Sequence, residues 1–169
     1  INWGRLLPQI VYYFAAYLNL VHQGAVAYGT PVDFVVPTGN FGNILAAWYA
    51  GQMGLPVGKL VCASNKNQVL ADFFASGVYD RRRDFYQTNS PSMDILISSN
   101  LERFLFAMTG NDGDKVALWM EQLKNEGIFK DVYPCTVQDL FCADIKNPFL
   151  RKCKRLWYFL HWKGYLKKH

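Results

Sequence analysis

Apolar residues recur at helical spacing near the start of the chain, and they predict a long helix over residues 5–23. Gly24 follows directly and is a natural end for that helix. The side chains expected on its apolar face are Leu6, Ile10, Tyr13, Phe14, Tyr17, Leu18 and Val21.

Strands and helices then alternate along the chain. Short apolar runs at residues 32–36 and 59–63 predict strands, and each run precedes a helical pattern, over residues 43–53 and 67–76 respectively. Each of these helices is followed by a glycine. This order predicts an α/β fold with a doubly wound, mainly parallel sheet and helices on both faces.

The second half begins with a polar, loop-like stretch at residues 80–95. Ser99 and Glu102 have the spacing of a capping box, which predicts the start of a helix that continues through Met108. A further amphipathic helix is predicted over residues 114–126. The side chains expected to point inward from it are Val116, Leu118, Trp119 and Leu123.

The composition is that of a folded domain or of a piece of a larger one. The chain has 169 residues, 51% of them apolar, which is enough to bury a core. Its four cysteines lack paired spacing, so neither a metal site nor a disulfide framework is expected, and reduced thiols in a cytoplasmic protein are the simpler account. No signal peptide is visible, and the first helix is too short and polar to predict a membrane span.

The basic charge is concentrated at the C-terminus. Residues 146–169 hold eight of the 18 Lys and Arg side chains and no acid, which leaves ten basic against 13 acidic residues elsewhere. Aromatic residues interleave with this charge. Such a tail would suit nucleic acid or an anionic membrane surface, but the body of the chain is mildly acidic, and we expect neither partner.

The stretch PTGNFGN, residues 37–43, joins the first predicted strand to the next helix. A glycine turn in this place gathers backbone N–H groups around an anion. Gly39 and Gly42 are expected to take positive φ and to let a ligand approach closely, and Asn43 to cap the helix. The turn is neither a P-loop nor a dinucleotide fingerprint. A tight strand–helix connection without a ligand fits the same pattern.

Four stretches together resemble one enzyme family. PTGNFGN is similar to the phosphate-binding loop of threonine synthase, a pyridoxal-phosphate enzyme of fold type II. INWGRLLPQIVYYF, LVCASNKNQVLADFFASGVY and TNSPSMDILISSNLERFLF resemble other segments of that family in the same order. The resemblance covers residues 1–140, and it leaves residues 141–169 as a divergent basic, aromatic tail, either genuine or the product of a truncated or altered reading of the gene.

The resemblance implies a lyase that converts O-phospho-L-homoserine and water to L-threonine and phosphate. The cofactor would be pyridoxal 5'-phosphate, whose ring acts as an electron sink. Asn2 matches a substrate-site candidate, whereas Ser92 and Asn100 lie in matched segments without an assigned role. The residues that match the loop holding the cofactor phosphate are Thr38, Gly39, Asn40, Phe41, Gly42 and Asn43.

The lysine that forms the Schiff base in this family precedes the segment matched by residue 1. We therefore expect no catalytic residue in this chain and no activity without the N- and C-terminal parts of the same enzyme. Phe129-Lys130-Asp131 has the same residues as the family's lysine motif. It comes after the phosphate loop in the sequence rather than before it, and it follows an amphipathic helix, so Lys130 is expected to be solvated. Lys59 and Lys66 are expected to be surface charges as well.

Two other classes of function stay open at this point. The loop would also serve a non-catalytic protein that binds a phosphate ligand. The tail would serve a protein that binds nucleic acid or a membrane surface through its cations and aromatic rings.

Overall fold

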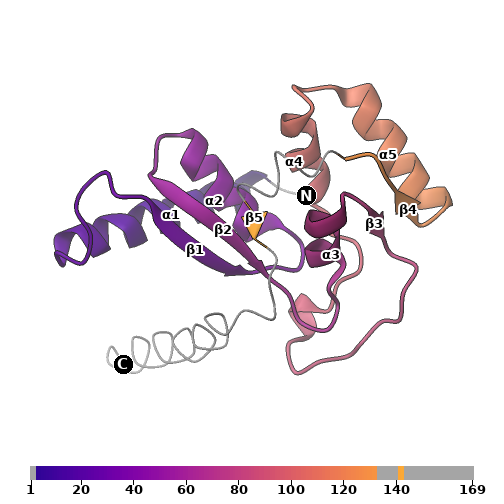
Figure 1. The fold of residues 1–169 in the computed structure, drawn as a ribbon, viewed down its shortest axis with the longest axis horizontal. Helices are drawn as coiled ribbons and strands as arrows, with labels where there is room; N and C mark the ends of the chain where they lie inside the picture. The colour runs from indigo at the N-terminus through magenta and orange to yellow at the C-terminus, as the bar shows by residue number, and fades with distance from the viewer. Residues whose placement is uncertain (1–2, 133–140, 143–169) are drawn as a thin grey trace.

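A computed structural model describes residues 3–132 and 141–142 (Figure 1). The chain opens with α1 (Trp3–His22), which packs along α2 (Gly42–Gln52). The helix ends where Gly24 takes a φ of 68°, as its sequence predicts. No helix in the described part of the chain combines the length and the apolar character that a bilayer crossing requires.

Three strands form a parallel sheet in the order β1 (Val32–Pro37), β2 (Val57–Ala63) and β5 (Phe141–Cys142). Phe34 pairs with Leu60 and Val36 with Cys62 across β1 and β2. The α2 helix connects these two strands and packs on both, which makes a βαβ unit. The predicted α/β class and parallel sheet are therefore confirmed.

The middle of the chain builds a second group of elements around aromatic side chains. It comprises α3 (Val69–Ser76), β3 (Tyr79–Asp80), the 3₁₀ turn η1 (Pro91–Met93), α4 (Leu101–Met108), α5 (Gly113–Asn125) and β4 (Ile128–Phe129). β3 and β4 pair antiparallel, and the rings of Tyr79 and Phe129 stack at 5.2 Å between centroids. In Figure 1, α4, α5, β3 and β4 occupy one end of the molecule, and β1, β2 and most of α1 lie towards the other.

Three details of the predicted helices are wrong. Leu18 of α1 and Leu118 of α5 are 53% and 54% exposed, because the neighbouring elements cover a narrower stripe of each helix than its apolar residues would fill. The α4 helix begins at Leu101 after Asn100, with no side-chain cap, so Ser99 and Glu102 do not form a capping box. The tail predicted for residues 141–169 lies outside the described residues except for β5, and the proposed domain division stays a prediction.

Candidate functional site

The connection from β1 to α2 turns at Phe41. Thr38 extends the ladder of β1, donating its N–H to the Ala63 carbonyl at 2.9 Å. Phe41 then adopts the left-handed conformation, with a φ of 63°, and it is 1% exposed. Its ring packs against Phe74 and Phe104 at 5.7 and 5.5 Å between centroids. Burial of this ring holds a conformation that is uncommon for a residue with a Cβ.

The expectation that Gly39 and Gly42 take positive φ is therefore wrong, since neither is among the positive-φ glycines. These glycines instead permit close packing. A Cβ at Gly39 would lie 3.1 Å from Ile95 Cδ1 and 3.3 Å from the Met93 Cα. A Cβ at Gly42 would lie 3.3 Å from Asn100 Nδ2.

Two carbonyl groups of the turn are held by the segment that leads into α4. Ser98 Oγ donates to the Gly39 carbonyl at 2.6 Å. Asn100 donates twice to the Asn40 carbonyl, from its backbone N at 3.2 Å and from Nδ2 at 2.9 Å. Contacts between residues about sixty positions apart therefore fix the orientation of the turn.

The first turn of α2 presents free donors. Phe41 precedes the helix without a side-chain cap, and no acidic residue lies in the first turn. Within the described residues, the amides of Gly42, Asn43 and Ile44 have no hydrogen-bond acceptor. Such unpaired N–H groups, together with the helix dipole, favour an anion at this end of the helix.

Asn43 does not cap the helix as its sequence predicts. It lies inside α2, and its side chain accepts from Tyr13 Oη at 2.7 Å, while its carbonyl accepts from the same hydroxyl at 3.0 Å. Burial raises the pKa of the Tyr13 hydroxyl above its ordinary value. The side chain of Asn43 thus ties the beginning of α2 to α1, and its backbone N–H remains a free donor.

A cavity of about 400 Å³ lies in front of this helix end. All six residues predicted for the phosphate loop line it, together with Ser92, Ser99 and Asn100. Asn2 lies outside the described residues. The sequence interpretation missed Arg5 and Gln9, which also line the cavity. Their four-residue spacing could have indicated them, because it places two polar side chains next to each other on an otherwise apolar helix.

Gln9 and Arg5 of α1 add polar character to the wall of the cavity. Gln9 Oε1 is buried and has no hydrogen-bond partner within the described chain. Arg5 brings an exposed guanidinium to the same cavity. The cavity therefore combines a helix N-terminus, backbone donors and a cationic side chain, which suits a phosphate ester.

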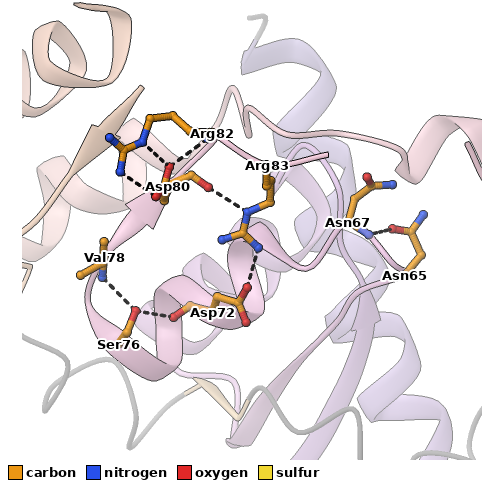
Figure 2. Close-up of polar contacts among 8 residues, drawn as sticks. All are labelled: Asn65, Asn67, Asp72, Ser76, Val78, Asp80, Arg82 and Arg83. Atoms are coloured by element: carbon orange, nitrogen blue, oxygen red, sulfur yellow. Dashed lines mark hydrogen bonds and ion pairs between the residues drawn. The ribbon is translucent and has the colours of Figure 1, made fainter. Parts of the chain in front are cut away.

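A polar network supports the turn that carries Ser92. Asp94 accepts from the Thr88 amide at 2.8 Å, from Asn65 Nδ2 at 2.6 Å and from Asn67 Nδ2 at 3.2 Å. The backbone N–H of Asn67 in turn donates to Oδ1 of Asn65, as Figure 2 shows. Desolvation raises the pKa of the Asp94 carboxyl, but the hydrogen bonds that it accepts outweigh this effect and hold the pKa below its ordinary value.

The three consecutive arginines after β3 do not form a free anion site. Arg82 pairs with Asp80 at 2.9 Å and Arg83 with Asp72, and both pairs are drawn in Figure 2. Arg81 donates to the Lys124 carbonyl at 3.0 Å. The hydrogen bond from Arg82 lowers the pKa of Asp80 to about 2. Arg82 and Arg83 are therefore paired with carboxylates, and the contacts of Arg83 and Arg81 join α3 and α5 to the intervening loop.

No lysine among the described residues lines the cavity. Lys59 is exposed on β2, and Lys66 lies over the Tyr86 ring at 5.9 Å. Lys130 is exposed directly after β4. The three candidates thus lie where the sequence interpretation expects them, at the surface.

Comparison with known proteins identifies the relatives of this chain. It is 56% identical over 131 residues to threonine synthase-like 1 of Homo sapiens, a match that covers 77% of this chain and 18% of the relative. It is 43% identical over 139 residues to threonine synthase of Saccharomyces cerevisiae, covering 77% of this chain and 26% of the relative. The chain is homologous to a segment of threonine synthase. No protein-family model matches it.

Solved threonine synthase structures show the same fold. The PLP-bound threonine synthase from Brucella melitensis is 45% identical, with a TM-score of 0.78, and the match covers 85% of this chain and 30% of that structure. Threonine synthase from yeast gives a TM-score of 0.77 at 39% identity, with the same coverage of both chains. The threonine synthase resemblance and the α/β fold are both confirmed, and the present chain spans less than a third of these structures.

Proposed function

We propose that the turn at residues 37–43 and the beginning of α2 bind the phosphate group of pyridoxal phosphate. The observation that carries the proposal is the uncapped end of α2, where Gly42 and Asn43, whose amides are unpaired, line the same cavity as the predicted loop. The similar structure from Brucella melitensis is described as PLP bound, which supports the same ligand here.

The residues present fit a phosphate ester. Gly42 and Asn43 line the cavity and supply backbone donors, and Gly39 and Gly42 keep the walls close without side chains. Thr38 also lines the cavity, but its hydroxyl already donates to the Val36 carbonyl at 2.7 Å. When bound, pyridoxal phosphate supplies an electron sink for carbanions of an amino acid. This chain's own residues bind and orient the phosphate and exclude water behind the buried Phe41 ring.

For the longer protein, we propose the threonine synthase reaction, a carbon–oxygen lyase step on O-phospho-L-homoserine. That substrate carries a second phosphate group, and Arg5 supplies a cation in the same cavity. Gln9, with its unpaired buried oxygen, is suited to accept a hydrogen bond from a substrate ammonium group. Asn2 stays a candidate for the same site.

The 169-residue chain alone is proposed to bind phosphate without turnover, since no lysine of the described chain lines the cavity. Its partners would be the other parts of the enzyme. The outer face of α1 supports this, because it is apolar and lacks any charge between Arg5 and His22. Exposed members of that face are Leu7, Val11, Tyr12 and Leu18. We place the protein in the cytoplasm, in keeping with the buried free thiol of Cys62.

A second candidate function is a non-catalytic phosphate-ligand protein. The same cavity supports it, and the lack of a cavity-lining lysine in the described chain favours it for the chain in isolation. The two candidates differ in whether the missing enzyme parts restore chemistry. The proposed role of the basic tail falls on residues outside those described.

The test is calorimetric titration of the 169-residue chain with pyridoxal phosphate and, as a matched ligand, with pyridoxal, which lacks the phosphate. We expect saturable binding of the phosphate ester alone and competition by inorganic phosphate. Equal affinity for both ligands would contradict the assignment of the loop. Threonine formation on addition of the missing segments would then separate the enzyme from the non-catalytic binder.

A further inference from the structure

We propose that Ser98 and Asn100 are positioning residues that orient the amides of the phosphate-binding turn. The inference rests on the proposed function of the turn. Neither side chain needs to contact the phosphate for this role. Both act through the carbonyl oxygens of Gly39 and Asn40.

The argument begins with the planarity of the peptide unit. In a trans peptide the C=O of one residue and the N–H of the next point in opposite directions. Because Ser98 holds the Gly39 carbonyl at 2.6 Å, the Asn40 N–H is directed away from Ser98. Ser98 does not line the cavity, whereas Gly39 and Asn40 do. The Asn40 amide is therefore turned towards the cavity side of the loop.

Asn100 acts on the next peptide in a different way, by occupying the carbonyl oxygen itself. Its backbone N–H and its Nδ2 both donate to the Asn40 carbonyl, at 3.2 and 2.9 Å. This carbonyl would otherwise present its negative end at the mouth of the anion site. Two donors on one oxygen remove that repulsion and fix the peptide immediately before Phe41, where the left-handed turn begins.

The surroundings of these two residues restrict their movement. Ser98 is 8% exposed and Asn100 is 9% exposed, so water competes little for their hydrogen bonds. Tyr79 Oη accepts from the Ser98 amide at 2.9 Å and donates to the Leu96 carbonyl at 3.0 Å, which anchors Ser98 to β3. Gly42 leaves the space that Asn100 Nδ2 occupies, since a Cβ there would lie 3.3 Å from it.

The experiment measures sulfate and pyridoxal phosphate affinity of the full 169-residue chain and its variants. Sulfate keeps both charges over the whole range used, so only the protein titrates. Loss of the side-chain donor in Asn100→Ala is expected to weaken sulfate binding about tenfold, as is Ser98→Ala. Asn100→Gln keeps an amide donor and should recover part of the affinity. Ser76→Ala is the matched control, because it also removes a hydroxyl that donates to a backbone carbonyl, that of Asp72 at 2.7 Å, but Ser76 does not line the cavity.

Asn100→Asp adds a readout that loss of packing alone does not produce. An ionised carboxylate cannot donate to the Asn40 carbonyl, whereas a protonated one can. Affinity of this variant relative to the unmodified chain should therefore be lowest near neutral pH and should rise as the pH falls to about 5 and below, since burial raises the pKa of a carboxyl above its ordinary value of about 3.9. The carbonyl carbon NMR signal of Asn40 should move with the same pH dependence.

The outcomes separate the inference from the function on which it rests. If the unmodified chain binds sulfate and pyridoxal phosphate, but Asn100→Ala and Ser98→Ala bind both equally well while remaining folded, the positioning role is wrong and the phosphate site stands. If the unmodified chain binds neither ligand, the proposed site itself is wrong, and the positioning role is overturned with it. Circular dichroism of each variant identifies any loss of folding, and Asn100→Gln then provides the conservative comparison.

Discussion

Replacement of Gly39 by alanine tests the close packing of the proposed phosphate loop. The new Cβ would lie 3.1 Å from Ile95 Cδ1, 3.3 Å from Met93 Cα and 3.3 Å from the Ser92 carbonyl oxygen. Two of these three atoms are backbone, so a side-chain rotation cannot relieve the contact. Overpacking of this kind destabilises by about 1–3 kcal/mol. Alanine also restricts the unfolded chain, which stabilises the folded state by about 0.4–1 kcal/mol. This gain applies here because the φ of Gly39 is not positive, so alanine can adopt it without backbone strain.

The expected net change is a loss of about 1–2 kcal/mol in the free energy of unfolding. Urea denaturation measures it, and calorimetry should show weaker phosphate binding, since the 92–95 turn must move away from the loop. Gly51→Ala is the matched control. Gly51 lies within α2, where a Cβ would meet Val57 at an ordinary 3.5 Å, so alanine should stabilise by about 0.5–1 kcal/mol. If Gly39→Ala proved as stable as Gly51→Ala, the close approach of the two segments would be refuted.

Two further predictions concern titratable groups. The pKa of Asp94 is lowered in the folded state, so its contribution to stability is fully present above the ordinary Asp pKa of about 3.9 and is lost as the pH falls through the lower folded value. Asp94→Asn should be less stable than the unmodified chain at neutral pH, and its free energy of unfolding should fall less on acidification. Urea denaturation over a pH series measures this. If the free energy of unfolding of both proteins changed with pH in parallel, the prediction would be contradicted. Burial raises the pKa of the Cys62 thiol to about 12, partly offset by the Thr38 and Ser64 hydroxyls, so it should resist a maleimide at neutral pH until the chain unfolds. Rapid labelling of Cys62 in folded protein, followed by mass spectrometry of the peptides, would show that the β2 packing is wrong.

The helices and strands of this fold could be predicted because apolar periodicity and helix-ending glycines are signals carried by neighbouring residues. The helices at residues 5–23, 43–53 and 67–76 end within one or two residues of their predicted ends. Gly24, Gly54 and Gly77 then all take positive φ. The strand–glycine–helix pattern predicted the position of the turn, and the resemblance to threonine synthase supplied the six loop residues, which all line the cavity.

The contacts that shape the loop were beyond such patterns. The hydrogen bonds of Ser98 and Asn100 join residues 59 and 60 positions apart, and no local spacing encodes them. The left-handed turn falls at Phe41 rather than at a glycine because ring burial against Phe74 and Phe104 outweighs the local preference. The capping box at Ser99 failed for a similar reason, since Asn100 is occupied with the loop and α4 begins after it.

If the proposed function is right, these contacts explain how a short glycine turn would hold an anion without a cationic side chain inside it. A turn made only of local hydrogen bonds would leave the carbonyls of Gly39 and Asn40 free to rotate towards the ligand. Here both carbonyls are occupied from the α4 side, and the Phe41 ring fixes the peptide that follows. The donors at the beginning of α2 are thus aligned before any ligand binds, so binding requires little further ordering of the loop. Under the proposed function, the specificity of the site would then depend on the distant segment at residues 98–100 as much as on the glycine turn itself.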